Sequence, residues 1–531
     1  AKADNAILND SDLLRMKNAG ITVWDSTKSM NGSENLRVYS VISKATDMLR
    51  FSYSNEIGST AAAPSGMISR LRRIFPNAKQ TSTASLNHAG ETDAAAFAEL
   101  ASGIRNMIDS GEINESLNSL YSHFSGSESY FSRLDVLDKM FFNDNSPAAL
   151  GSETAMRLYG RQLMGTATRL ETFNQCPFRY LIQFGMRLKE RPQRTEKAND
   201  RGSFIHEAFD KLIKEYLNSN CDFTTISAAD IHEKLERILP PMMIEHNNGI
   251  LLDSARMRAE FQRIAELVET AALAVVKQIN AGKFRPFASE VNFGHDNDAY
   301  PPLRIQAENG VTYSITGIAD RVDKYVSPSN EEFIRIIDYK TYGQTFDYTE
   351  LANGLRIQLP LYASAMQNAM RKETNNPLFT AGMYYLHIGD AQASEGISED
   401  KAETEIQRSF RMNGLTLNDE NILEAMDSSF PGSSDVLHGV RYSKKEGMFK
   451  GSLADEDEME ETLEFAKKIA GKTLRAIMRG RIEVSPTEYH GKTACKYCPY
   501  ISICCFDTTA ACRYRRPRAV DADKFFGREN K

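Results

Sequence analysis

Short apolar runs separated by turn residues dominate residues 313–340. Residues 313–318 lead into an apolar strand pattern at 317–323, residues 327–330 supply the turn, and residues 333–337 form a β-rich return strand. The pattern predicts a β-hairpin whose return strand ends in Asp338-Tyr339-Lys340. Because side chains on a strand alternate between faces, Asp338 and Lys340 share one face, and the partner strand can bring Asp320 beside them.

Apolar positions at helical spacing surround this hairpin and predict helices over residues 67–75, 94–108, 200–217, 253–279 and 455–478. Ser65 and Thr168 are placed to cap helices, and residues 49–54 alternate like a strand. Strands are predicted at 287–293 and 379–387, and a helix begins within 355–363. Gln358 and Tyr362 share one face of that helix. Strands and helices mixed in this way predict an α/β fold.

The composition is that of an ordinary globular protein, with 41% hydrophobic and 25% charged residues. A length of 531 residues predicts two or three domains. There is no apolar run long enough to span a membrane and no signal-peptide pattern at the start. The chain begins without Met and in mid-pattern, so we expect a fragment of a longer protein. The net charge of −7 argues against a protein that coats nucleic acid but permits an enzyme with a local basic channel.

The hairpin has the residues for metal-assisted chemistry. Two carboxylates and an ammonium converging at the end of a hydrophobic hairpin suit a hard divalent cation, with the lysine next to the attacked group. The alternative is a surface hairpin with an ordinary salt bridge. An ATPase motor is not expected, because neither GKT triplet, at Gly471 or Gly491, has a glycine five residues earlier.

Cysteines near the end of the chain have metal-ligand spacing. Cys495 and Cys498 form a C-x2-C knuckle and Cys504 follows, which gives three thiolates where a tetrahedral site needs four. Cys505 directly follows Cys504 and would be a strained fourth ligand, so Cys176 is the better candidate. A zinc site of four cysteines, or of three with His490, is the alternative. We interpret Cys221 and Cys512 as free thiols, and seven cysteines without a secretory signal indicate a reducing compartment.

The motifs TRLETFNQCPFRYLIQFGMRLKE, GSFIHEAFD, GIADRVD, IIDYK, Gln358-x-x-x-Tyr362 and CKYCPYISIC occur in one order. Together, over residues 166–507, they resemble the C-terminal nuclease domain of the AddB family, which belongs to the bacterial AddAB helicase–nucleases. The resemblance implies a PD-(D/E)xK (restriction-endonuclease-like) core at 166–510, with a mixed sheet flanked by helices and clasped by a [4Fe–4S] cluster. Residues 1–150 would be the C-terminal part of an inactivated helicase-like domain of α/β type, and residues 511–531 a basic tail.

The resemblance also assigns roles to individual residues. It implies magnesium ligands at His206, Asp320 and Asp338, a catalytic lysine at Lys340, and supporting roles for Gln358 and Tyr362. It implies cluster ligands at Cys176, Cys495, Cys498 and Cys504. Glu290 could equally bind metal or lie on the surface, and Asp323 is expected to pair with Arg321 or Lys324.

The expected function is a magnesium-dependent DNA exonuclease module in the bacterial cytoplasm that processes double-strand breaks for recombinational repair. Single-stranded DNA would be fed to it by an AddA-type helicase subunit in a heterodimer. We expect a basic and aromatic DNA path, with candidates Arg179, Tyr180, Arg187 and Arg321. The alternatives are a nuclease-dead, DNA-binding scaffold for a motor subunit, and a CRISPR-associated or replication-type iron–sulfur nuclease.

Overall fold

The computed structural model describes residues 9–23, 27–54, 56–57, 60–80, 92–110, 115–142, 149–189, 191, 198–219, 221–295, 298–307, 310–389, 399–508 and 512–528. The chain divides into two compact units, Ala1–Glu99 and Leu100–Lys531. The sequence predicts a domain boundary after residue 150. The division into units lies earlier, and the assignment of residues 1–150 to a helicase-like domain stays a prediction.

The first unit contains short elements: α1 (Asp10–Asn18), α2 (Thr27–Ile42), β1 (Glu56–Ile57), β2 (Thr60–Ala61), α3 (Gly66–Ile74) and the start of α4 (Asp93–Ser110). The predicted cap of α3 is confirmed, because Oγ of Ser65 accepts the N–H of Met67 at 3.3 Å. The strand predicted at 49–54 is wrong. Those residues are exposed and belong to no strand, and a strand pattern without a partner strand is not stable.

The second unit begins with helices and a small sheet: α5 (Glu115–Ser125), α6 (Phe131–Phe142), α7 (Ser152–Tyr159), β3 (Gln162–Gly165), α8 (Ala167–Gln175) and α9 (Pro177–Tyr180). The predicted cap of α8 lies two residues too late, since Thr166 is the N-cap. β3 pairs in parallel with β6 (Thr312–Ile315), which pairs antiparallel with β5 (Leu303–Gln306).

The centre of this unit is a six-stranded sheet with the order β13-β10-β9-β8-β7-β4. Its strands are β4 (Arg285–Phe293), β7 (Gly317–Val326), β8 (Glu332–Lys340), β9 (Leu378–His387), β10 (Asn413–Leu417) and β13 (Leu453–Ala454). β8 runs parallel to β9 and β10 parallel to β13, whereas the other neighbours are antiparallel. The predicted hairpin is the β7–β8 pair, and the predicted mixed α/β fold is confirmed.

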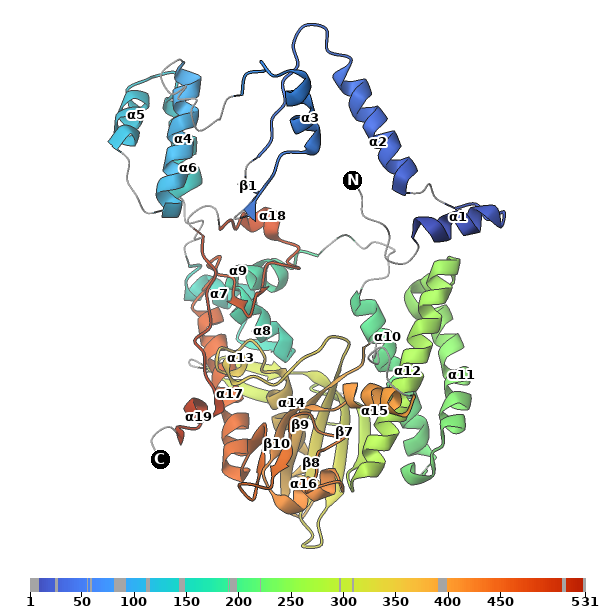
Figure 1. The fold of residues 1–531 in the computed structure, drawn as a ribbon. Helices are drawn as coiled ribbons and strands as arrows, with labels where there is room; N and C mark the ends of the chain where they lie inside the picture. The colour runs from blue at the N-terminus through green and yellow to red at the C-terminus, as the bar shows by residue number, and fades with distance from the viewer. Residues whose placement is uncertain are drawn as a thin grey trace. The chain divides into compact units, whose positions relative to one another are not determined.

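Helices cover this sheet (Figure 1). The helices α10 (Ala198–Asn218), α11 (Ala228–Glu245) and α12 (Ala255–Ala281) lie on the side of β4 and β7. On the side of β10 lies α17 (Glu456–Met478), which packs against α14 (Gln358–Met370). The apolar face of α12, including Val268 and Val275, is buried in the same core as Ile334 and Ile336 of the hairpin. Burial of these faces is the main source of stability for the arrangement.

Shorter elements complete the second unit: α13 (Tyr348–Ala352), α15 (Glu399–Ser409), α16 (Glu420–Met426), β11 (Arg441–Ser443), β12 (Met448–Lys450), β14 (Glu488–Tyr489), β15 (Lys492–Thr493), α18 (Ile501–Cys504) and α19 (Ala522–Phe525). The segment predicted as a basic tail packs against the second unit where it is described. The Val520 N–H donates to Oγ1 of Thr349 at 3.0 Å, and the Phe525 ring packs on Tyr348. No described helix combines the length and the apolar character that crossing a membrane requires.

Candidate active site and cysteine pocket

Asp320 lies in the middle of β7 and is fixed from two directions. The backbone N–H of Tyr339, on the neighbouring strand β8, donates to its Oδ2 at 2.6 Å. Nδ1 of His206, in the first half of the long helix α10, lies 3.3 Å from the same oxygen. The hairpin register and the placement of α10 therefore bring together two residues that are far apart in the sequence.

Glu290 on β4 completes a compact group with these two residues. One ligand atom from each of His206, Glu290 and Asp320 lies within 4.8 Å of the others. Glu290 stands opposite Asp320, because its neighbours pair as Ser289–Arg321 and Val291–Ala319. Its φ of 47° is in the left-handed region, which costs a residue with a Cβ roughly 1–3 kcal/mol. Such strain is typical of a side chain that the fold holds in a functional position.

Charges in this group alter its protonation. Burial and the charge of Asp320 raise the pKa of Glu290 to about 7. Burial alone would lower the pKa of His206, but its hydrogen bond to Asp320 and the carboxylates around it raise that pKa overall. Carboxylates held so close together repel one another, and a cation between them would relieve that repulsion.

Asp338 and Lys340 lie on one face at the end of β8, as predicted, and their side chains are in direct contact. The Nε2 amide of Gln358 donates to Oδ1 of Asp338 at 3.0 Å. Burial and the charge of Asp320 raise the pKa of Asp338 to about 7, against the opposing effect of Lys340. Asp338 lies outside the compact group of ligand atoms, so its role as a metal ligand stays a prediction.

Tyr362 is buried one helical turn after Gln358, and the Gln358 side chain opposes the rise in the pKa of its phenol that burial causes. The Tyr362 ring also packs edge-on against Phe293 and lies against Gly317, where an added Cβ would come within 2.5 Å of it. Glycine at the start of β7 therefore makes room for this ring. Tyr362 supports Gln358 from within the core and does not reach into solvent.

Behind the active-site face lies a buried charge network of Arg321, Asp323 and Arg335. Arg321 and Asp323 are each 0% exposed, with Nε of Arg321 3.0 Å from Oδ1 of Asp323. Arg335 Nε donates to Oδ2 of Asp323 at 2.8 Å. The expected Asp323–Arg321 pair is confirmed. The expectation that Arg321 contacts DNA is wrong, because its side chain is fully buried. Successive residues of a strand face opposite sides, so Arg321 points away from the face of β7 that carries Asp320.

The other residues expected along a DNA path differ in exposure. Tyr180 is 1% exposed, with its ring against Phe173 and Phe184, so it belongs to the core and its assignment to the DNA path is corrected. Arg187 is exposed and Arg179 is half-buried. These two remain candidates for DNA contact.

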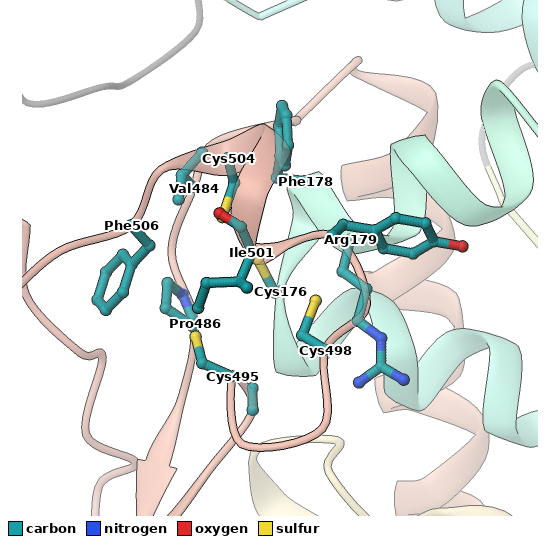
Figure 2. A pocket seen from close by; sticks show the side chains of 12 residues that line it. Cys176, Phe178, Arg179, Val484, Pro486, Cys495, Cys498, Ile501, Cys504 and Phe506 are labelled. Atoms are coloured by element: carbon teal, nitrogen blue, oxygen red, sulfur yellow. The ribbon is translucent and has the colours of Figure 1, made fainter. Parts of the chain in front are cut away.

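The four cysteines assigned to a cluster line one pocket (Figure 2). Cys176 follows α8, and Cys495, Cys498 and Cys504 come from the C-terminal segment. Burial raises the pKa of Cys176 and raises that of Cys495 to about 11, and each neighbouring thiol would add to the repulsion between thiolates. Four thiols that line one pocket suit a group that supplies positive charge to several sulfur atoms.

The alternatives for this pocket are less well supported. Cys505 is exposed, is the C-cap of α18, and is not among the residues that line the pocket. His490 is exposed and does not line it either.

Backbone contacts also tie the two ends of the domain together at this pocket. The Phe178 N–H donates to the carbonyl of Glu483 at 3.2 Å, and the Thr487 N–H donates to that of Gln175 at 2.9 Å. The Arg515 side chain donates to the carbonyl of Asn174. The segment before the sheet and the segment after it are therefore joined independently of any bound group.

Two residues of the site were missed or left open by the sequence reasoning. Glu290 was undecided, because nothing local distinguishes a strand carboxylate that faces a site from one at the surface. Glu171 was missed, although it is a buried carboxylate on α8 whose Oε1 accepts the backbone N–H groups of Ile357 and Gln358 at 2.7 and 2.9 Å. A glutamate beside Leu170 on the apolar face of a helix was the available signal.

Relatives with curated names are similar to this chain over nearly its whole length. Three of them are B subunits of the ATP-dependent helicase/deoxyribonuclease of different bacteria, as their names state. The chain is 29% identical over 521 residues to that of Acetivibrio thermocellus, 30% over 518 to that of Clostridium tetani, and 31% over 529 to that of Clostridioides difficile. These matches cover 95–96% of this chain and 44–45% of the relatives, so the chain spans less than half of their length.

The family profile described as the PD-(D/E)XK nuclease superfamily matches residues 166–505. This region contains the hairpin, the group of His206, Glu290 and Asp320, and all four cysteines of the pocket. The resemblance inferred from the motifs is thereby confirmed at the level of the superfamily. Because the match covers more than half of the chain and includes this geometry, the protein belongs to the PD-(D/E)XK nuclease superfamily.

Proposed function

We propose that this chain is the magnesium-dependent exonuclease module of an AddAB-type helicase–nuclease and hydrolyses phosphodiesters of single-stranded DNA. One observation carries the proposal: the hairpin β7–β8 places Asp338 and Lys340 beside a compact group of His206, Glu290 and Asp320. Relatives whose names include a deoxyribonuclease support the choice of DNA.

The donor atoms of the compact group fit a hard divalent cation. Two carboxylates and one imidazole nitrogen offer ligands that Mg²⁺ or Mn²⁺ accepts. When bound, such a cation would neutralise charge on the scissile phosphate and make a nearby water more acidic. His206, Glu290 and Asp320 would hold it, and Asp338 would join them once Lys340 has moved away.

The chain's own residues would then orient the reactants. Tyr339 N–H and His206 fix one oxygen of Asp320, which limits the directions in which that carboxylate can turn. Gln358 fixes Oδ1 of Asp338 and leaves Oδ2 to Lys340. The ammonium of Lys340 would leave Asp338 and pair with the phosphate instead. There it can stabilise developing negative charge or orient the attacking water. Burial keeps these charges effective, because bulk water does not screen them.

The cysteine pocket is proposed to hold a [4Fe–4S] cluster with a structural role. Its donor set is four thiols, which is the set that such clusters take. Cys176 and the three C-terminal cysteines would then hold the two ends of the domain together, adding to the backbone contacts already described.

The partner and substrate follow from the names of the relatives. A protein named as one subunit of an ATP-dependent helicase/deoxyribonuclease has at least one partner, and we propose an AddA-type helicase as the motor that feeds a single strand. The reaction would take place in the bacterial cytoplasm during processing of double-strand breaks. Arg179 and Arg187 are proposed contacts to the DNA backbone.

The proposal is tested by incubating the purified chain with end-labelled single-stranded DNA, with magnesium or with a chelator. We expect digestion with magnesium only, and its loss in Asp320→Asn. Asp435→Asn, which changes an exposed aspartate paired with Arg408, is the matched control and should digest normally. DNA binding without digestion by the wild-type chain would support the alternative of a nuclease-dead scaffold and would refute the proposal.

A further inference from the structure

Glu171 connects the helix before the cysteine pocket to the active site. It lies on α8, and its Oε1 accepts the backbone N–H groups of Ile357 and Gln358 at 2.7 and 2.9 Å. These groups begin α14, where the first N–H groups of a helix have no partner within the helix. A carboxylate at this position satisfies two donors and interacts favourably with the helix dipole.

The connection continues from the backbone of Gln358 to its side chain. Gln358 Nε2 donates to Oδ1 of Asp338 at 3.0 Å. Glu171 is therefore one residue removed from the catalytic strand, and Gln358 is the residue between them.

A second contact from the same helix supports this arrangement. The Asn174 side chain donates to the carbonyl of Gly354 at 3.0 Å and to Thr473 Oγ1 at 2.9 Å. Gly354 has a φ of 69°, and a Cβ there would come within 2.4 Å of Asn174. The loop before α14 is thus held against α8 at two places, Gly354 and the Ile357–Gln358 pair.

We propose that Glu171 is a positioning residue, which fixes the start of α14 so that Gln358 holds Asp338 in place for the reaction. The inference deepens the proposed function and rests on it. Glu171 acts through Gln358, so its effect should depend on the presence of the Gln358 side chain. A residue that only stabilises the fold would act independently of Gln358.

A double-mutant cycle tests this dependence. We expect Glu171→Leu, which has no acceptor, to lower kcat on the order of tenfold with KM for DNA unchanged, since both hydrogen bonds to Oε1 are lost. Glu171→Gln keeps one acceptor oxygen and should stay within about threefold of the wild type. The double variant Glu171→Leu/Gln358→Ala should be no slower than Gln358→Ala alone. If kcat of the double variant fell by the product of the two single effects, the proposal would be overturned.

A second readout does not require nuclease activity. Hydrogen exchange of the full chain, followed by mass spectrometry, should speed up in Glu171→Leu and, to a smaller extent, in Glu171→Gln. The change should be confined to peptides at the start of α14 and the end of β8. Faster exchange spread over the whole domain, or none at these peptides in either variant, would contradict the proposal. If the wild type does not cleave DNA while this local exchange is seen, the proposed function fails and the positioning link stands.

Glu350→Gln provides the matched control. Glu350 is a partly buried carboxylate near this loop, but its side chain pairs with Arg356 at 2.7 Å, whereas Ile357 and Gln358 donate to the buried Glu171. We expect the control to keep kcat and to leave exchange at the start of α14 unchanged. An effect equal to that of Glu171→Leu would show that loss of any carboxylate here disturbs the loop, and would overturn the specific role of Glu171.

Discussion

The backbone N–H of Tyr339 donates a 2.6 Å hydrogen bond to Oδ2 of Asp320, so the two strands of the hairpin are joined at the proposed metal-binding carboxylate itself. This bond places Asp338 and Lys340, which flank Tyr339, at a defined distance from Asp320. The geometry of the site therefore follows from the register of β7 against β8.

Asp338→Ala and Lys340→Ala should each reduce cleavage by about 10²-fold or more, because each removes a charge that acts on the reacting phosphate. DNA binding should be nearly unchanged, as measured by filter binding or fluorescence anisotropy. His206→Ala should be milder, since water can replace one ligand of a magnesium ion. Lys324→Ala, at the far end of the hairpin and paired with Glu332, is the control. Digestion at the wild-type rate by Asp338→Ala would contradict the assignment.

Cation affinity should rise with pH. In the metal-free protein, the pKa of Glu290 and that of Asp338 are each raised to about 7, chiefly by burial. A cation requires the ionised carboxylates, so protons compete with it below about pH 7 and the competition ends above that pH. Isothermal titration with Mn²⁺, repeated in two buffers at each pH, should detect release of protons at about pH 6.5 and little release at about pH 8.5. Affinity independent of pH across this range would contradict the prediction.

The purified protein should contain about four irons per chain, held by four cysteines. Cys176→Ser should lose iron and lower the melting temperature, because a bound cluster contributes its binding free energy to folding. Cys505→Ser and Cys221→Ser should keep the iron content and the melting temperature of the wild type, since neither thiol lines the pocket. Metal analysis and thermal melting of anaerobically prepared protein provide the measurements. Stoichiometric zinc without iron would favour the zinc alternative, and full iron in Cys176→Ser would exclude Cys176 as a ligand.

Asp323→Asn should destabilise the fold by about 3–5 kcal/mol, because it leaves two buried arginines without their anion. Chemical denaturation of the whole chain measures this change. The matched control is Glu464→Gln, which removes an exposed pair with Lys467 on α17 and should change the free energy of unfolding by less than about 1 kcal/mol. An Asp323→Asn variant as stable as the wild type would show that the network contributes no net stability.

The hairpin was predictable because its information is local. Apolar alternation fixes the two strands, the turn residues fix their connection, and the period of two places Asp338 and Lys340 on one face. Likewise, Cys495 and Cys498 are close in the sequence, so their spacing alone indicates a metal or cluster site. The order of the motifs, from the segment before Cys176 to the segment ending at Cys504, was sufficient to indicate the superfamily.

Other features depend on contacts between distant segments, and only the tertiary structure decided them. The sequence could not show that Tyr180 and Arg321 are buried, because an aromatic or basic residue in a motif has the same local pattern in a core as on a DNA path. It left Glu290 undecided, since its placement opposite Asp320 depends on the pairing of β4 with β7. It offered no reason to connect Glu171 to Gln358. Local periodicity selects the faces of each strand and helix, whereas packing and hydrogen bonding between segments decide which faces meet.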